Sequence, residues 1–216
     1  MTDVAVVLSG CGFLDGAEIH ESVLTLLALD THNLSYQCYA PDKPQMDVVN
    51  HAAGEPADES RNVLVEAARI ARGNIRPLSE LDPDSYRAIV FPGGYGAAKN
   101  LCNFAVAGAD MVLDPQVERV AKAFATRGKP AGYICIAPAM ISRIYPQGVR
   151  CTIGTDEGTA AALTAMGAEH VACPVDDAVS DERYKVVSTP AYMLAQRISE
   201  ASAGIGKLIQ QIADWL

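Results

Sequence analysis

Short runs of apolar residues alternate with segments of helical periodicity along the first part of the chain. The apolar runs 4–8 and 86–91 and the alternating stretch 34–39 have the length and composition of buried strands. Residues 18–31, which lie between the run 4–8 and the stretch 34–39, carry apolar side chains at helical spacing. Because strands joined through helices pair in parallel, this pattern predicts an α/β fold with a mostly parallel sheet.

The remainder of the chain continues this alternation after one interruption. Residues 42–60 are rich in Pro, Gly and Asp, which predicts an excursion with a hairpin around 46–55. No linker, repeat or low-complexity tract divides the sequence, so we expect one domain over 1–216. The other predicted elements are helices at 62–72, 113–127, 159–166 and 191–215 (the last broken or bent by Gly204 and Gly206) and strands at 129–134, 170–173, 178–179 and 185–188.

Composition and charge exclude several classes of function. Half of the residues are apolar and the net charge is −9, which disfavours broad nucleic-acid binding. The apolar runs are shorter than a membrane span, and the first residues do not resemble a secretory signal. The six cysteines form no CxxC pair and the four histidines are scattered, so the spacing predicts no metal site. We therefore expect a cytoplasmic protein with no nucleic-acid, membrane or metal partner.

Cys135 is the first candidate for chemistry. It directly follows the predicted buried strand 129–134, and residues 136–141 read as the start of a helix. A sharp strand-to-helix turn would push this side chain out of the sheet toward the helix N-terminus, where the helix dipole favours thiolate over thiol. The sequence therefore predicts a reactive thiol, with an inert core cysteine as the alternative.

Two backbone amides are candidate oxyanion donors beside this thiol. Gly93 and Gly94 follow the predicted strand 86–91, and glycines let backbone N–H groups approach a ligand closely. Together with the N–H of Ile136, the N–H of Gly94 could form an oxyanion hole. A plain tight turn is the alternative reading of these glycines.

Several acids, histidines and a second cysteine could assist the thiol. Glu18 and Glu21 lie three residues apart at the start of the first helix, near one face, where acids also stabilise the helix N-terminus. A carboxyl beside a thiolate would keep its proton and donate a hydrogen bond to sulfur. His170, near a predicted strand end, and His20 are candidate bases. Cys11, in the first loop, could border the pocket.

Ten short motifs are distributed along the chain around these candidate residues: Leu8-Ser-Gly-Cys-Gly12, Glu18-Ile-His-Glu21, Ala40-Pro-Asp-Lys43, Arg61-Asn-Val-Leu64, Pro92-Gly-Gly94, Gly96-Ala-Ala-Lys-Asn-Leu101, Cys135-Ile-Ala-Pro-Ala139, Ile153-Gly-Thr-Asp156, Gly167-Ala-Glu-His170 and Thr189-Pro-Ala-Tyr-Met193. With the first-helix acid, the Pro-Gly-Gly turn and the cysteine in this order, the chain resembles the ThiJ/PfpI superfamily within the class I glutamine-amidotransferase-like fold. Through these motifs it resembles more narrowly the bacterial ElbB group of isoprenoid-biosynthesis proteins. The resemblance covers essentially the whole chain and implies a flavodoxin-like sandwich.

The resemblance implies roles for individual positions. The superfamily nucleophile falls on Cys135, its acidic partner on Glu21 with Glu18 as the alternative, and the oxyanion positions on Gly94 and Ile136. Protease-like relatives carry His directly after the nucleophile, where this chain has Ile136, which argues against a peptidase. Amidotransferases carry a late His-x-Glu pair, and the segment 188–192 has no His, which argues against a glutaminase.

The leading functional hypothesis is a cofactor-independent glyoxalase that converts a small 2-oxoaldehyde such as glyoxal to its hydroxy acid, an activity ascribed to the ElbB group. Cys135 would add to the aldehyde, and Glu21 or His170 would act as the base. Two alternatives share the same thiol: a redox-sensing or regulatory protein without catalysis, and a deglycase or amidohydrolase. By analogy with the superfamily, we expect a homodimer.

Overall fold

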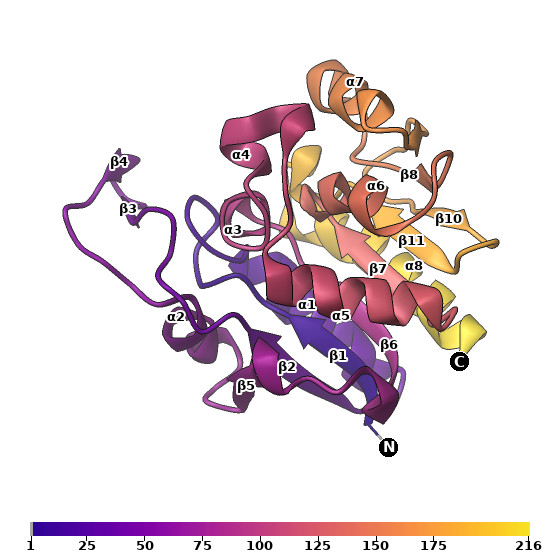
Figure 1. Ribbon diagram of the computed structural model, residues 1–216, viewed down its shortest axis with the longest axis horizontal. Coiled ribbons are helices and arrows are strands. Elements are labelled where there is room, and N and C mark those ends of the chain that lie inside the picture. The colour runs from indigo at the N-terminus through magenta and orange to yellow at the C-terminus, as the bar shows by residue number, and fades with distance from the viewer. Residues whose placement is uncertain (1) are drawn as a thin grey trace.

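A seven-stranded sheet organises the structure, a computed structural model that describes residues 2–216. All neighbouring strands in it pair in parallel except β10 and β11, which pair antiparallel. The predicted α/β fold with a mostly parallel sheet is therefore confirmed (Figure 1). In spatial order the strands are β10 (Val179–Asp181), β11 (Val186–Thr189), β7 (Ala131–Ile134), β6 (Tyr86–Phe91), β1 (Thr2–Val7), β2 (Tyr36–Ala40) and β5 (Ile75–Pro77).

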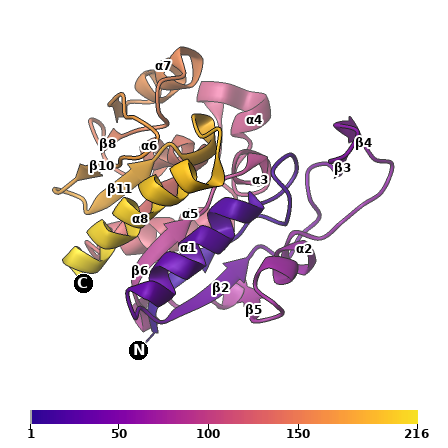
Figure 2. The same ribbon diagram turned by 180° about the vertical axis from the view of Figure 1, so that it is seen from behind.

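Helices cover both faces of this sheet (Figures 1 and 2). Alternate residues of a strand point to opposite faces, so Val4 and Val6 join one core cluster while Ala5 and Val7 join the other. Both faces of β1 are therefore apolar, as parallel strands between two helix layers require. One layer contains α1 (Ile19–Thr31), α2 (Val63–Ile70) and α8 (Ile198–Trp215), and the other contains α3 (Tyr95–Lys99), α4 (Phe104–Ala107), α5 (Pro115–Thr126) and α6 (Ile141–Ile144).

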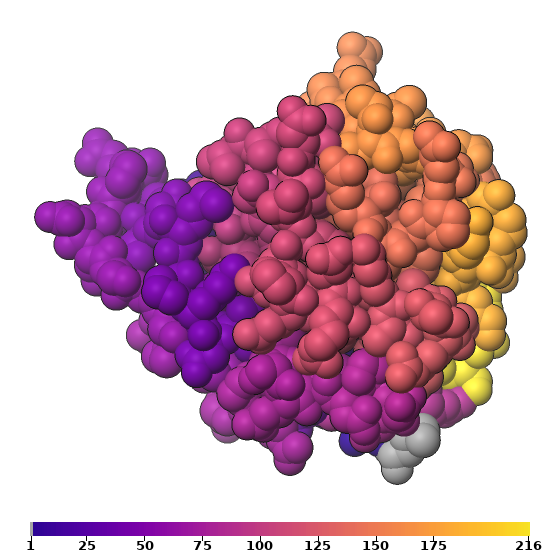
Figure 3. All heavy atoms as spheres, viewed as in Figure 1, coloured from indigo at the N-terminus to yellow at the C-terminus, as the bar shows by residue number. Residues whose placement is uncertain are grey.

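Two smaller features lie outside these layers. The predicted hairpin is present as β3 (Val49–Asn50) and β4 (Glu55–Pro56), and it projects from the body (Figure 3). Its base is fixed by an ion pair of 2.8 Å between Lys99 and Asp47. At the other end of the sheet, β8 (Arg150–Cys151) pairs with β9 (Glu169–His170), and α7 (Glu157–Ala165) lies between them in the chain.

Some elements differ from the sequence-based expectation. The strand β5 and the helices α3 and α4 were not predicted, since each has only three to five residues and shows no readable periodicity. The helix expected after Cys135 is divided into a 3₁₀ turn over Ala137–Met140 and the short α6. The expected strand 170–173 is only β9, outside the main sheet. No helix within residues 2–216 is long and apolar enough to cross a membrane.

The last helix was predicted over 191–215 with a break or bend at Gly204 and Gly206, but α8 begins only at Ile198 and is not broken at either glycine. Gly204 faces β11, where no side chain fits. A Cβ on Gly204 would lie 2.4 Å from Thr189 Oγ1 and 2.7 Å from the Val175 carbonyl oxygen. Gly206 has open space around it. The first glycine therefore lets α8 approach β11 closely.

These two glycines give a matched test of this packing. We expect Gly204→Ala to lower the free energy of unfolding by about 1–3 kcal/mol, because α8 must move away from β11. Gly206→Ala should raise it by roughly 0.5–1 kcal/mol through helix propensity. Urea denaturation of both variants measures the two values, and equal effects would contradict the close approach at Gly204.

Candidate active site

Cys135 stands at a strained turn at the end of the central strand β7. Its φ is 62°, in the left-handed region that side chains other than glycine rarely adopt. Its N–H donates to the Thr189 carbonyl at 2.9 Å, which holds the turn against β11. The turn directs the thiol away from the sheet, and strain of this kind concentrates at functional sites.

The carboxyl of Glu21 is the partner of this thiol. Glu21 lies in the first turn of α1 and is completely buried. Its Oε2 accepts from the Gly93 N–H at 3.0 Å, and its Oε1 accepts from the Tyr192 N–H at 3.1 Å. The same carboxyl lies next to the Cys135 thiol, close enough that each group shifts the pKa of the other. Three separate strand ends thus converge on one carboxyl.

Gly93 makes this convergence possible. A Cβ on it would lie 2.4 Å from Cys135 Cβ and 2.6 Å from Glu21 Oε2, both far inside van der Waals contact. Any side chain at this position would separate the acid from the thiol. Gly94, with φ of 90°, closes against the backbone of Glu18 in the same way, with a virtual Cβ 2.3 Å from the Glu18 nitrogen.

Burial keeps both members of the pair protonated near neutral pH. Burial raises the pKa of Glu21 to about 8, the nearby charge of Glu18 adds to this, and the amides of Tyr192 and Gly93 oppose it. Burial also raises the pKa of the Cys135 thiol well above its usual value, and a charged Glu21 raises it further. A protonated Glu21 can therefore donate its O–H to sulfur, as the sequence suggested for a carboxyl in this position.

The expectation that the helix dipole would lower the thiol pKa was wrong. The helical segment after Cys135 begins as a 3₁₀ turn, and the thiol is only 7% exposed, so desolvation outweighs the local dipoles. The backbone N–H groups of Gly94 and Ile136 lower the pKa of the thiol, but by less than burial raises it. These two amides lie together at the thiol, as predicted for oxyanion donors.

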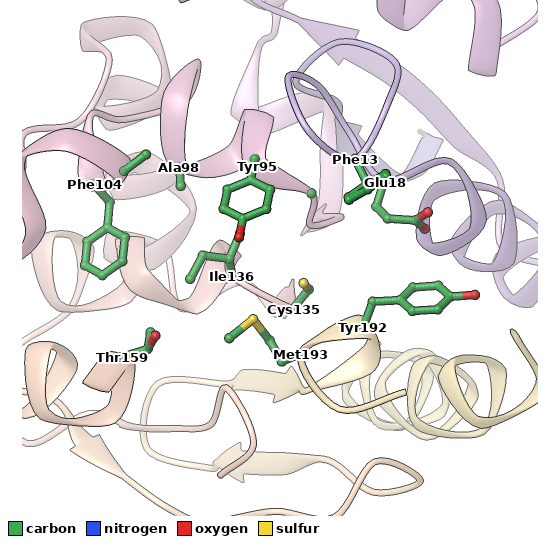
Figure 4. A pocket seen from close by; sticks show the side chains of 12 residues that line it. Phe13, Glu18, Tyr95, Ala98, Phe104, Cys135, Ile136, Thr159, Tyr192 and Met193 are labelled. Carbon is green, nitrogen blue, oxygen red and sulfur yellow. The ribbon is translucent and has the colours of Figure 1, made fainter. Parts of the chain in front are cut away.

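A cavity of about 310 Å³ opens above the thiol (Figure 4). Most of its wall is apolar, and Cys135 lies at its base, between Ile136 and Met193 in the view of Figure 4. The lining residues are Phe13, Glu18, Gly94, Tyr95, Ala98, Phe104, Ala105, Cys135, Ile136, Thr159, Tyr192 and Met193. The thiol is therefore the reactive group that a bound molecule would meet.

The other acid and histidine at the start of α1 have supporting positions. Glu18 lines the cavity, and its Oε2 caps α1 by accepting from the Glu21 N–H at 2.6 Å. His20 does not line the cavity, and its Nδ1 pairs with the Tyr192 hydroxyl at 2.8 Å. Glu21, rather than Glu18, is therefore the acid beside the thiol.

The structure does not bring His170 or Cys11 to the cavity. His170 lies in β9, where its Nε2 accepts from the Ile153 N–H at 3.3 Å and burial lowers its pKa. Cys11 is half-buried in the first loop, and neither residue lines the cavity. His170 lies outside because its strand belongs to the small β8–β9 sheet rather than to the central one. The proposal that it acts as the base loses its geometric support.

Sequence reasoning missed most of the cavity wall. Phe13, Tyr95 and Phe104 lie in loops or very short helices, where no periodicity marks them. The sequence marks Tyr192 only as a member of the motif Thr189-Pro-Ala-Tyr-Met193 and predicts no contact for it, yet its N–H donates to Glu21 and orients that carboxyl. The two glycines before Tyr95 were the available indication that a ligand approaches there. Within residues 2–216, no group of three or more His, Cys, Asp or Glu residues is arranged to hold a metal ion.

Known proteins resemble this chain over nearly its whole length. No protein-family model matches the chain. It is 44% identical over 221 residues to the human glutamine amidotransferase-like class 1 domain-containing protein 3, mitochondrial, covering 98% of this chain and 82% of the relative. The rat ES1 protein homolog, mitochondrial, is also 44% identical over 221 residues, covering 98% of this chain and 83% of the relative.

Solved structures show the same fold. An isoprenoid biosynthesis protein with an amidotransferase-like domain from Ehrlichia chaffeensis superposes with a TM-score of 0.91 at 36% identity, over 99% of this chain and 100% of that chain. A glyoxalase III from Candida albicans superposes with a TM-score of 0.64 at 13% identity, over 98% and 97%. The identity of 36% confirms the predicted relation to the isoprenoid-biosynthesis group, and the likeness to a ThiJ/PfpI domain protein from Brachyspira murdochii, at 16% identity with a TM-score of 0.56, confirms the shared fold.

The raised pKa of Glu21 gives a prediction for stability. Since the folded protein holds this proton up to about pH 8 and the unfolded chain releases it near 4.5, Glu21 stabilises the fold at low pH and loses this contribution as the pH rises. A Glu21→Gln variant has no such dependence. We expect the difference in unfolding free energy, wild type minus variant, to fall by up to about 1.4 kcal/mol per pH unit between about pH 4.5 and about pH 8 and to be flat outside this window. Urea denaturation at several pH values measures it, and a constant difference would show that Glu21 does not hold the proton.

Proposed function

The chain belongs to the glutamine amidotransferase-like class 1 family that includes the human domain-containing protein 3 and the ES1 proteins, and we infer that it is a cofactor-independent glyoxalase that converts glyoxal to glycolate. The observation that carries this proposal is the buried Glu21–Cys135 pair at the base of an apolar cavity, with two amides directed at the sulfur. The shared fold with a glyoxalase III supports it. A link to isoprenoid biosynthesis is part of the same proposal, supported by the relative from Ehrlichia chaffeensis that carries that name.

The first step activates the thiol through Glu21. When the carboxyl is ionised, it takes the proton of Cys135, and the thiolate attacks the aldehyde carbon of the substrate to form a hemithioacetal. The new alkoxide lies at the N–H groups of Gly94 and Ile136, then receives the proton held by Glu21. Glu21 is thereby returned to its carboxylate form next to the cysteine that carries the hemithioacetal.

The second step moves the carbon-bound proton. Glu21 removes it from the former aldehyde carbon, and the electrons of the C–H bond form an enediolate. The hydroxyl proton of that carbon passes to the neighbouring oxygen, and Glu21 returns its proton to the neighbouring carbon, which gives a thioester of the hydroxy acid. One carbon is oxidised and its neighbour is reduced, so no external oxidant or reductant is required. Water then hydrolyses the thioester, which releases glycolate and restores the Cys135 thiol.

The competing functions differ in how well the site suits them. A redox sensor requires an accessible thiol with a lowered pKa, whereas Cys135 is buried and its pKa is raised. A deglycase or amidohydrolase would use the same thiol and amides, so it remains the second candidate. The homodimer and the cytoplasmic location stay predictions, and the human and rat relatives are described as mitochondrial.

Replacement of the nucleophile tests the proposed chemistry. We expect Cys135→Ala to lose glyoxal turnover by at least about a thousandfold, because no thioester can form. Cys173→Ala, which removes a buried thiol outside the cavity, serves as the matched control and should retain it. Glycolate production measured by nuclear magnetic resonance with both variants decides the matter. Comparable turnover by Cys135→Ala would exclude this mechanism.

The pH dependence tests the role of Glu21. Because the carboxylate form begins the reaction and the pKa of Glu21 is raised to about 8, kcat/KM should rise roughly tenfold per pH unit below this value and level off above it. Glu21→Gln should lose this rise together with most of the activity. A wild-type profile that is flat between about pH 6 and pH 8 would indicate another base.

A further inference from the structure

The cavity is much larger than glyoxal requires. Its volume of about 310 Å³ lies within the range of roughly 300–1,000 Å³ that is usual for pockets holding drug-sized ligands. Glyoxal, the smallest dialdehyde, carries no group beyond its two carbonyls. A substrate bound through its aldehyde at Cys135 would leave most of the cavity filled with water. The space above the thiol therefore fits a larger group attached to the reacting carbons.

Aromatic and apolar side chains line that space. In Figure 4, Tyr95 lies above Ile136, Phe104 is on one side and Tyr192 on the other. Phe13 and Met193 complete the wall, so the apolar groups come from five separate segments of the chain. Phe13 and Tyr95 are about half exposed, at 47% and 52%, and both line the cavity, so a bound group could cover them. Burial of an aryl or branched alkyl group against these faces would be favourable.

The charge of the lining residues disfavours substrates that carry a carboxylate or phosphate. Glu18 is the one charged residue among the lining residues, and none of them is Lys, Arg or His. Lys99 lies 5.7 Å from the Tyr95 ring centroid, but its Nζ is paired with Asp47 at 2.8 Å and bonded to the Leu14 carbonyl at 2.9 Å. A carboxylate or phosphate on the substrate would therefore meet an apolar wall and a like charge, with no cation to compensate.

We propose that this cavity selects uncharged 2-oxoaldehydes bearing an aryl or branched alkyl group, in preference both to glyoxal and to 2-oxoaldehydes that carry a carboxylate or phosphate. The proposal rests on the glyoxalase function inferred above and names its substrate class. Phe104 favours the aryl or branched alkyl group through apolar contact. Glu18 disfavours a carboxylate or phosphate on the substrate through its charge.

The same charge also favours release of the product. The reaction converts an uncharged aldehyde into a hydroxy acid, which is an anion at neutral pH. In a cavity whose charged lining residue is Glu18, this anion is bound less well than the substrate that produced it. The hydroxy acid should therefore inhibit weakly, whereas its uncharged amide should inhibit more strongly.

Steady-state kinetics with four substrates test the proposal. We expect kcat/KM for phenylglyoxal to exceed that for glyoxal by at least about tenfold, after division by the rates of hemithioacetal formation with a free thiol. We expect para-carbamoylphenylglyoxal to exceed para-carboxyphenylglyoxal by roughly tenfold or more, since the two have similar size and differ in charge. Cys135→Ala should turn over none of them.

Matched variants assign each preference to its residue. Phe104→Ala should reduce the preference for phenylglyoxal over glyoxal, whereas Val106→Ala, on the same helix but exposed and outside the cavity, should not. Glu18→Gln keeps a side-chain oxygen to cap α1 and should reduce the discrimination against the carboxylate substrate. Glu80→Gln removes the same charge from an exposed site outside the cavity and should leave the discrimination unchanged.

The outcomes separate this proposal from the function on which it rests. Turnover by Cys135→Ala would overturn the glyoxalase mechanism. Turnover that depends on Cys135 but prefers glyoxal, or that accepts the carboxylate substrate equally, would overturn the substrate class alone. If no substrate is turned over, calorimetric titration with mandelamide and mandelate decides the selection. Binding of mandelamide at least about tenfold tighter supports it, and equal or reversed affinities contradict it.

Discussion

The pairing of the Glu21 carboxyl with the Cys135 thiol is the interaction on which the rest of the site depends. Because ionisation is unfavourable for a buried acid beside a buried thiol, both groups keep their protons at neutral pH. Burial, more than any neighbouring charge, raises the pKa of each. The fold provides this burial by placing the start of α1, the Gly93 turn and the end of β7 within contact of one another. The site is thus a neutral pair that becomes reactive when it loses one proton.

Glycine at two positions permits this convergence. Gly93 allows the acid to reach the thiol, and Gly94 allows its turn to press against the backbone at Glu18. The left-handed backbone conformation of Cys135 turns the thiol toward the acid. The hydrogen bond from the Cys135 N–H to the Thr189 carbonyl holds this conformation. The energy stored in this turn, of about 1–3 kcal/mol for such conformations, is offset by the packing of the central sheet between its two helix layers. The geometry of the site therefore depends on the ends of several neighbouring strands together, and not on Cys135 alone.

Much of the fold and the core of the site could be predicted from the sequence. The apolar runs of β1 and β6 and the order of helices and strands were sufficient for the sheet, and the turn at Cys135 marked the nucleophile. The acid was identified through a family resemblance rather than through periodicity. The direction in which the pKa of the Cys135 thiol is shifted could not be predicted, because it depends on burial by residues far apart in the chain. For the same reason, the aromatic wall and the exclusion of His170 became visible only when the strands were placed in space.

The protonation state of Glu21 tests the central claim most directly. Infrared difference spectra of the wild-type protein between about pH 6 and pH 10, with Glu21→Gln as the reference, report the carbonyl stretch of a protonated buried carboxyl. The account predicts that this band is present at the lower pH, absent from the variant, and lost with a midpoint near the raised pKa of about 8. A Glu21 carboxylate that is already ionised at about pH 6 would contradict it, since the thiol would then face a charge rather than a proton donor.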